Sequence, residues 1–427
     1  MIEASARWLS ATDAMQRVRA GDLKPQEVVD AHLDAIDRFD SRIHAYIHVD
    51  RNARTTSGVT LAVKDSQPVA GMPYTYGTPS WRDRIAKADA VPVARARAAG
   101  MAILGKTNLP ELAASIGTTN TMFPPTQNPW REGITPGGSS GGSGAAVAAG
   151  MASVALGGDT GGSIRIPASC CGVVGLRPTP DRIPSEEVDA TVLQSRGPMT
   201  RTVADARLLF SLMTATRPSG VSSKRRLLIG TAFAGADPAC QDACRRAAKA
   251  LENAGHEIQE IKWDPEPVTE GYAVVRRASM ASFPADLSTF GPGIRKLAEE
   301  GRSLTAMDYF HAFELATNAA NRAVAVPLQT RYDFLLTPTL GLPPMQIERV
   351  PPFLGEEWAR HVQFVLPVTF ARSPAISIPA GLHEGLPIGV QLVGQFGQEY
   401  DLLDFAEQLE QMPGFGFLRP PEMEVTG

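Results

Sequence analysis

The chain has 427 residues, of which 43% are hydrophobic and 20% charged, a composition that excludes wholesale disorder. Its 45 acidic and 41 basic side chains give a formal net charge of -4, which argues against a general electrostatic binder of nucleic acid. No apolar run approaches the roughly 20 residues that a membrane-spanning helix needs.

Helices and short apolar strands alternate along the first part of the chain. A capping serine and an apolar stripe with helical spacing predict two helices within residues 10–39. Residues 60–63 and 101–104 are predicted strands, and residues 95–99 are a predicted helix between them. This alternation predicts an α/β sheet with helices on its faces.

Glycine, serine and alanine dominate between Pro136 and Gly175. This segment contains a small-residue helix at 145–149 and an apolar strand at 151–156, so it is not a flexible linker. Residues 217–223 are the best candidate for a linker. Beyond them we expect a strand at 226–230, a helix at 241–254, a largely helical region at 264–330, and strands at 332–336 and 388–393.

The cysteines give no sign of a disulfide framework or a zinc site. Cys170 and Cys171 are adjacent, whereas Cys240 and Cys244 have helical spacing. There is no Cys-x-x-Cys pair and no histidine cluster nearby, so we interpret all of these thiols as small buried hydrophobic groups. The N-terminus lacks the basic and apolar segments of a secretory signal, and a cytoplasmic location is expected.

Two glycine-rich segments are candidates for chemistry: Pro136-Gly-Gly-Ser-Ser-Gly-Gly-Ser-Gly144 and Gly157-Gly-Asp-Thr-Gly-Gly-Ser-Ile-Arg165. In the second, Ser163 follows two glycines and precedes a predicted helix. Such glycines let successive backbone N–H groups face one point, and this nest near a helix N-terminus favours an anion. An acyl-transfer enzyme needs the same arrangement to hold the oxyanion beside its nucleophile, and a phosphate ligand would use it too.

Lys64 is the candidate base, because it ends the apolar run Leu61-Ala-Val63. If the strand buries this lysine, desolvation disfavours its ammonium form, and a neutral amine can accept a proton near pH 7. A serine hydroxyl needs such a base, because it is a weak nucleophile by itself. Taken alone, a lysine at a strand end is more often an ordinary surface residue.

Together these segments resemble the amidase signature family of serine hydrolases. The resemblance extends over about residues 10–410, with further family-like sequence at 104–112, 128–130, 171–179, 197–203, 332–339 and 385–394. It implies a mixed, largely parallel, twisted central sheet flanked by helices on both faces. It also implies a single domain over residues 1–427, with the motif-bearing core at about 55–215 and 325–410 and a helical substrate-side region at about 264–330.

The resemblance assigns catalytic roles to three side chains. Ser163 is the expected nucleophile, and Ser139, which follows a cis peptide bond in the family, bridges it to Lys64. Neutral Lys64 takes a proton from Ser139, and Ser139 takes one from Ser163. The expected oxyanion donors are the backbone N–H groups of Thr160, Gly161, Gly162 and Ser163.

Supporting roles are expected for Ser140, Asp159 and Arg165. Ser140 is predicted to add a hydrogen bond to Lys64. Asp159 and Arg165 are predicted to hold the nest by pairing with the backbone or with each other, and a substrate-binding role for Arg165 is the lesser alternative.

An acyl pocket is predicted around Met122, Phe123 and Phe364, although core packing is the more common role of such side chains. The approach to the lysine at 53–60 and the region at 262–332 look shorter than is usual in the family. Both shape the substrate entrance, so we expect a more open site.

Two further motif matches are interpreted as coincidences. Residues 100–107 fit the phosphate-loop pattern G-x-x-x-x-G-K-T, but their centre is an apolar strand rather than a flexible loop. Residues 138–142 fit the G-x-S-x-G elbow of α/β-hydrolases, but no strand precedes them. A rival esterase mechanism would use this elbow with His383, which lies in a predicted turn.

The predicted function is cleavage of a C–N bond, in an amide or in a carbamate or urea-type compound, through an acyl-Ser163 intermediate. No metal or organic cofactor is implied. The expected partner is a small amide or carbamate, with no nucleic acid and no membrane, and the expected state is a monomer or homodimer. Two alternatives stay open: the amidase subunit of a glutamyl-tRNA(Gln) or aspartyl-tRNA(Asn) amidotransferase complex, and a non-catalytic binding scaffold.

Overall fold

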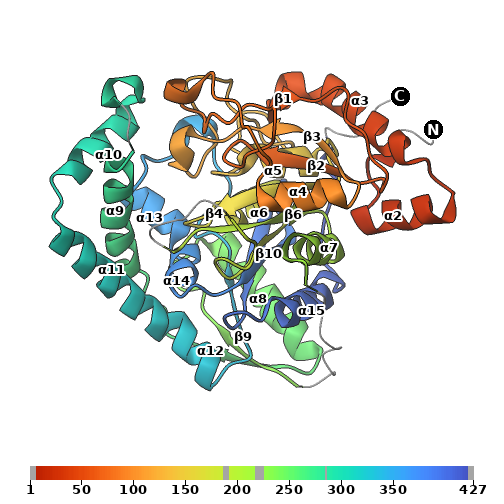
Figure 1. Ribbon diagram of the computed structural model, residues 1–427. Helices are drawn as coiled ribbons and strands as arrows, with labels where there is room; N and C mark the ends of the chain where they lie inside the picture. The colour runs from red at the N-terminus through yellow and green to blue at the C-terminus, as the bar shows by residue number, and fades with distance from the viewer. Residues whose placement is uncertain (1–5, 186–191, 217–225, 284–285, 422–427) are drawn as a thin grey trace.

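A computed structural model describes residues 6–185, 192–216, 226–283 and 286–421, and the predicted linker at 217–223 lies outside them. The strands of these residues form one sheet of 11 strands in the order β1-β3-β2-β4-β6-β5-β10-β11-β9-β7-β8 (Figure 1). Their bounds are β1 (Tyr46–Val49), β2 (Thr60–Lys64), β3 (Ala102–Thr107), β4 (Val154–Asp159), β5 (Val174–Arg177), β6 (Ser195–Thr200), β7 (Leu228–Thr231), β8 (Glu257–Glu260), β9 (Phe334–Pro338), β10 (Ala375–His383) and β11 (Leu386–Val393).

The sheet is mixed, as expected, but parallel pairs do not predominate. Parallel pairing is confined to the groups β3-β2-β4 and β9-β7-β8, and the other neighbouring strands are antiparallel. Strands β10 and β11 form a hairpin, and no helix among the described residues separates β5 from β6, whereas parallel neighbours require a longer crossover connection.

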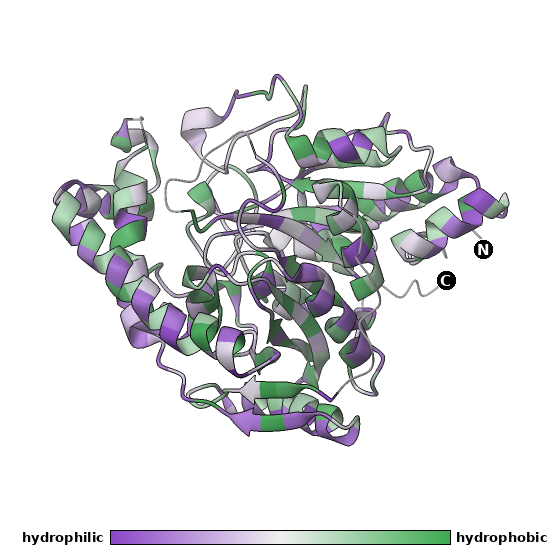
Figure 2. Ribbon diagram, turned by 60° about the horizontal axis from the view of Figure 1, so that its bottom comes forward, coloured by the Kyte–Doolittle hydropathy of each residue, from purple (hydrophilic) through white to green (hydrophobic). Residues whose placement is uncertain are grey.

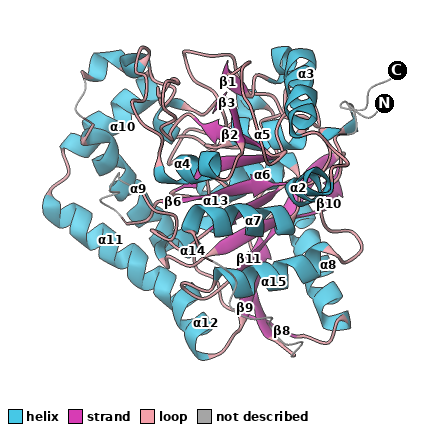
Figure 3. Cartoon of the chain, turned by 45° about the vertical axis from the view of Figure 1, so that its right-hand side comes forward, coloured by secondary structure: helices cyan, strands magenta, loops and turns pink. Residues whose placement is uncertain are grey.

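Helices cover both faces of the sheet (Figure 3). On one face lie α2 (Ala11–Ala20), α4 (Val91–Ala98), α7 (Val203–Thr214), α8 (Pro238–Asn253) and α15 (Glu399–Glu410). On the other lie α3 (Pro25–Ile43), α5 (Gly141–Ala148), α6 (Arg165–Cys171), α13 (Glu356–Val362) and α14 (Val365–Phe370). The α/β architecture with helices on both faces is therefore confirmed.

The predicted helical region at 264–330 is also confirmed. It contains α9 (Glu266–Ala281), α10 (Pro292–Arg302), α11 (Ala306–Ala320), a π-helical turn (Asn321–Ala325) and α12 (Val326–Thr330). Helices α10 and α11 both pack on α9, and the group stands at one side of the molecule (Figure 1). Short 3₁₀ turns occur at Pro79–Trp81, Glu111–Ala113, Leu287–Thr289 and Ile347–Arg349.

The small-residue helix α5 is entirely buried between the sheet and α6. Its glycines allow this close approach: a Cβ added at Gly144 would lie 3.2 Å from the Pro167 carbonyl oxygen and 3.3 Å from Cys171 Sγ. Tight packing of this kind fixes the loop that precedes the helix, which carries Ser139.

Apolar side chains fill both faces of the sheet, and the peripheral helices alternate polar and apolar residues along their length (Figure 2). All four cysteines are buried and free, as the sequence predicts. In the described part of the chain, no helix combines the length and apolarity needed to cross a bilayer.

Candidate active site

The sheet brings the two glycine-rich segments and Lys64 to one place. Strands β2 and β4 are parallel neighbours, with Val63 opposite Leu156, so their carboxyl ends lie at the same edge. Lys64 is the last residue of β2, and the loop that contains Ser163 follows β4 directly. A hydrogen bond of 3.1 Å from the Ser140 N–H to the Ser163 carbonyl oxygen ties the two glycine-rich segments together.

The Lys64 side chain is 2% exposed, and its Nζ lies 2.7 Å from Ser139 Oγ. The Gly158 carbonyl oxygen, at 3.5 Å, is a second and weaker contact. Burial lowers the pKa of Lys64 to about 7, and the opposing influence of the Asp159 charge is smaller. A substantial fraction of this amine is therefore neutral at neutral pH and able to accept a proton.

Ser139 is fully buried, and the peptide bond that joins it to Gly138 is cis, as the resemblance implies. Glycine is required at 138, because an added Cβ would lie 2.4 Å from the Gly117 carbonyl oxygen. The neighbouring Ser140 does not bond Lys64 as expected. Its hydroxyl instead pairs with the backbone N–H and C=O of Gly158, at 3.3 Å each, because it faces β4.

The nest at 160–163 connects β4 to α6. Gly162 has φ +100°, a conformation that favours glycine, and an added Cβ would lie 2.6 Å from a Val365 methyl. Its N–H, expected to face the oxyanion, donates to Asp159 Oδ1 at 2.8 Å. The N–H groups of Thr160, Gly161 and Ser163 remain the candidate donors.

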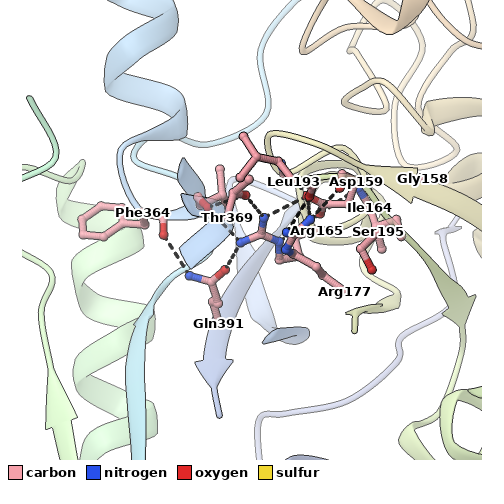
Figure 4. Close-up of polar contacts among 12 residues, drawn as sticks. Gly158, Asp159, Ile164, Arg165, Arg177, Leu193, Ser195, Phe364, Thr369 and Gln391 are labelled. Atoms are coloured by element: carbon pink, nitrogen blue, oxygen red, sulfur yellow. Dashed lines mark hydrogen bonds and ion pairs between the residues drawn. The ribbon is translucent and has the colours of Figure 1, made fainter. Parts of the chain in front are cut away.

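Asp159 and Arg165 form a buried ion pair behind the nest, as predicted (Figure 4). Arg165 Nε and Nη2 donate to the two carboxylate oxygens at 3.0 and 2.9 Å. The same guanidinium donates to Gln391 Oε1 at 2.6 Å and to Thr369 Oγ1 at 2.9 Å. Arg165 is completely buried, so the structure places it in a supporting position rather than against substrate.

Arg177 is a third charge in this cluster and was not anticipated. Its Nη1 lies 3.2 Å from Asp159 Oδ1. Burial alone would raise the pKa of Asp159, but Arg165 and Arg177 hold it well below its usual range. The carboxylate thus stays charged and continues to accept the Gly162 N–H.

Lys64, Ser139 and Ser163 open onto a cavity of about 320 Å³. Thr160 and Gly158 line it beside them. The rest of its wall is formed by Ser66, Tyr74, Tyr76, Trp81, Arg84, Leu112, Ala113, Gln194, Tyr272, Arg276, Ser279, Met280 and Phe283.

Comparison with known proteins agrees with this geometry. The family model described as Amidase matches residues 27–403. This chain belongs to the amidase signature family.

Among the relatives of this amidase, the acylamidase of Rhodococcus erythropolis is 30% identical over 483 aligned positions that cover 100% of both chains. A glutamyl-tRNA(Gln) amidotransferase subunit of Carboxydothermus hydrogenoformans is 31% identical, and the match covers 97% of this chain and 99% of that relative. The structure of 6-aminohexanoate cyclic dimer hydrolase complexed with substrate superimposes with a TM-score of 0.87, at 28% identity, over 98% of this chain and 99% of its own.

Membership of this family makes the protein a hydrolase that acts on carbon–nitrogen bonds. The alignment with the acylamidase has more positions than this chain has residues, so that relative contains segments that this amidase lacks.

The side chains expected to form the acyl pocket of this amidase do not line the cavity. Phe364 is fully buried and stacks on Trp263, with ring centroids 6.0 Å apart, so it belongs to the hydrophobic core rather than to the cavity wall. Met122 and Phe123 belong to a turn in which both N–H groups donate to Asn120 Oδ1 at 2.8 Å.

The two coincidental motifs have structural explanations in this amidase. Residues 102–107 are strand β3, and the buried Lys106 donates to Asp65 and to the carbonyl oxygens of Gln67 and Pro73. The G-x-S-x-G segment follows a loop rather than a strand, and His383 is exposed at the end of β10.

Proposed function

We propose that the protein is an amidohydrolase that works through an acyl-Ser163 intermediate and a Ser163–Ser139–Lys64 proton relay. The observation that carries this proposal is the buried Lys64 amine, 2.7 Å from Ser139 Oγ, in the cavity that Ser163 also lines. A buried lysine is rare in proteins unless it is paired with a charge or serves chemistry.

In the proposed reaction, Ser163 Oγ attacks the carbonyl carbon of the substrate. Its proton passes to Ser139, and the Ser139 proton passes to Lys64. The oxyanion is held by backbone N–H groups of the nest at 160–163. The tetrahedral intermediate then collapses, and the leaving nitrogen takes a proton back through Ser139 as the C–N bond breaks. Water hydrolyses the acyl-enzyme by the same route in reverse.

One link of this relay is open in the free protein. Within the described residues, no hydrogen bond joins Ser139 Oγ to Ser163 Oγ. Catalytic hydrogen bonds are often long without substrate and shorten in the Michaelis complex. We infer that rotation of the partly exposed Ser163 side chain closes the link when the carbonyl group of the substrate enters the nest.

A fluorophosphonate probe tests the nucleophile directly. We expect mass spectrometry of the labelled protein to place the adduct on Ser163, and Ser163→Ala to abolish labelling. Ser279 lines the same cavity, so Ser279→Ala is the matched control and should still be labelled. Absence of an adduct on folded wild-type protein would favour a non-catalytic scaffold, and an adduct on Ser140, the serine of the G-x-S-x-G segment, that depends on His383 would favour the elbow mechanism.

The pH dependence of kcat/KM tests the base. Only neutral Lys64 can accept a proton, and its pKa lies at about 7. We expect kcat/KM to rise about tenfold per pH unit below pH 7 and to level off above it. A profile that falls through pH 7 as pH increases, measured with a substrate that does not titrate in this range, would exclude the amine as the base.

The amidase subunit of a tRNA-dependent amidotransferase is the second candidate function. The similarity to the glutamyl-tRNA(Gln) amidotransferase subunit of Carboxydothermus hydrogenoformans favours it. Such a subunit requires partner chains and uses glutamine as its ammonia donor. Efficient turnover of simple amides by the isolated chain, without release of ammonia from glutamine, would count against this role.

A further inference from the structure

Two separate segments form most of the wall of the cavity above the serines. One is the loop from Ser66 to Arg84, and the other is α9 with its continuation to Phe283. The rings of Trp81 and Phe283 join them, with centroids 5.7 Å apart. Neither segment contributes to the proposed relay, so their side chains are free to contact the remote part of a substrate.

Among the described residues that line the cavity, the charges of this wall are positive and no aspartate or glutamate balances them. Each segment contributes one arginine, Arg84 from the loop and Arg276 from α9. A partly enclosed site lined by charge of one sign concentrates ligands of the opposite sign.

Both guanidinium groups lie over aromatic rings. Arg84 Cζ lies 4.1 Å from the centroid of Tyr74 and 5.2 Å from that of Trp81, and Arg276 Cζ lies 5.8 Å from that of Phe353. Arg276 Nε is buried and has no hydrogen-bond partner among the described residues. A guanidinium that is not paired with a carboxylate of the protein can donate two parallel hydrogen bonds to a carboxylate of a ligand.

The adjacent residue on α9 shows the contrasting arrangement. Arg277 Nε donates to Glu300 Oε2 at 2.7 Å, so its charge is neutralised within the helical region. Arg277 does not line the cavity. Two neighbouring arginines of α9 therefore differ within the described part of the chain. Arg277, outside the cavity, is paired with a carboxylate, whereas Arg276, on the cavity wall, has no carboxylate partner.

We propose that the substrate is an acidic amide, with a carboxylate remote from the bond that is cleaved, and that Arg84 and Arg276 bind this carboxylate. The inference rests on the proposed amidohydrolase function and narrows its substrate class. The aromatic side chains of the same cavity, among them Trp81 and Phe283, would contact the carbon skeleton that separates the carboxylate from the scissile amide.

Two pairs of compounds test this proposal. The first is glutaric acid mono-para-nitroanilide and the anilide in which an isopropyl group replaces the carboxylate. The second is para-(butanoylamino)benzoate and its para-isopropyl counterpart. Each pair varies charge at nearly constant shape, one on the acyl side and one on the amine side of the scissile bond.

Binding of all four compounds is measured by calorimetry on the Ser163→Ala variant, and kcat/KM on the wild-type chain. We expect the acid of at least one pair to bind about tenfold or more tightly than its neutral partner, and to be cleaved with a correspondingly higher kcat/KM. Arg84→Gln and Arg276→Gln, each added to the Ser163→Ala background, should each reduce this binding ratio severalfold.

Arg277→Gln and Arg82→Gln are the matched controls, because each removes the same charge from a neighbouring residue outside the cavity wall. Both should leave the binding ratio unchanged.

Equal binding of acid and neutral compounds would overturn the proposal. A preference for the acid that survives in both cavity variants would also overturn it, since the nest at 160–163 would then hold the acid. Failure of the amidohydrolase function is distinguished by absent cleavage and absent Ser163 labelling, while the binding ratio still decides the role of the arginines.

Discussion

Replacing Lys64 by methionine is expected to lower kcat by a factor on the order of 10⁴ and, at the same time, to stabilise the fold. The loss of rate follows from removing the base of the proposed relay. The gain in stability follows because a buried amine is more costly to protonate in the folded chain than in the unfolded one. We expect the free energy of unfolding to rise by about 1–3 kcal/mol at pH 6, after allowing for the hydrogen bond lost by Ser139.

The effect on stability should depend on pH in a defined direction. The pKa of Lys64 falls from 10.5 to about 7 on folding, so the unfolded chain binds more protons between these values. The wild-type chain therefore gains stability as pH rises through this window, whereas the variant lacks this gain. Urea titrations should show that the stability advantage of the variant, present at pH 6, is lost at pH 9.

Lys106→Met provides the matched control, because Lys106 is equally buried but carries a structural role. Its Nζ lies 3.2 Å from Asp65 Oδ1, and both side chains are completely buried. Removing this amine leaves the Asp65 carboxylate without its cation, so we expect a loss of about 3–5 kcal/mol. If Lys64→Met destabilised the protein as strongly as Lys106→Met does, the interpretation of Lys64 as a buried neutral base would be wrong.

Asp159→Asn is expected to lower the free energy of unfolding by about 3–5 kcal/mol, as much as Lys106→Met. The change keeps the shape of the side chain but leaves Arg165 and Arg177 as buried cations without their shared anion. It also weakens the acceptor for the Gly162 N–H, so kcat should fall in the protein that remains folded. Denaturant titration and single-turnover kinetics at a temperature where the variant is folded would separate the two effects.

An exposed ion pair supplies the comparison for Asp159. Asp242 lies 2.6 Å from Arg245 on the surface of α8, and both side chains are more than half exposed. Solvent screens such a pair, so Asp242→Asn should change stability by about 0.5 kcal/mol or less. A similarly small effect of Asp159→Asn would contradict the assignment of the buried cluster as the support of the nest.

Two parts of the proposed relay, Lys64 and Ser163, lie in short segments with a physical signature, whereas Ser139 was assigned only by resemblance to the family. An apolar run buries the lysine at its end, and paired glycines shape the nest before Ser163. The pairing of Asp159 with Arg165 could also be anticipated, since the two residues flank the nest. Ser140 was assigned the wrong partner, because which way a buried hydroxyl turns depends on the strand packed beside it.

The cavity wall could not be predicted in the same way. Arg84 and Arg276 are far apart in the sequence and lie in segments without a recognisable motif. They share a cavity only because α9 packs beside the loop that contains Trp81. Phe364 illustrates the opposite error, since an aromatic residue suitable for a pocket is here part of the core.

Strands β1, β5, β6, β8 and β10 were not predicted, and two of them, β6 and β10, contain residues that are unfavourable in strands. Strand β6 reads Ser-Arg-Gly-Pro-Met-Thr, with glycine and proline at its centre, and β10 contains Pro379. Both are nevertheless buried in the middle of the sheet, where tertiary packing overrides local preference.

The residues of the proposed relay, Lys64, Ser139 and Ser163, belong to other segments than the cavity wall above them. This separation has an evolutionary consequence. Residues that would select a substrate can diverge in the Ser66–Arg84 loop and in α9 without disturbing the strand ends and the all-buried α5 on which turnover would depend. Substitutions that change the preferred substrate from one nitrogen compound to another could thus accumulate in the cavity wall, while the residues of the proposed relay are inherited unchanged.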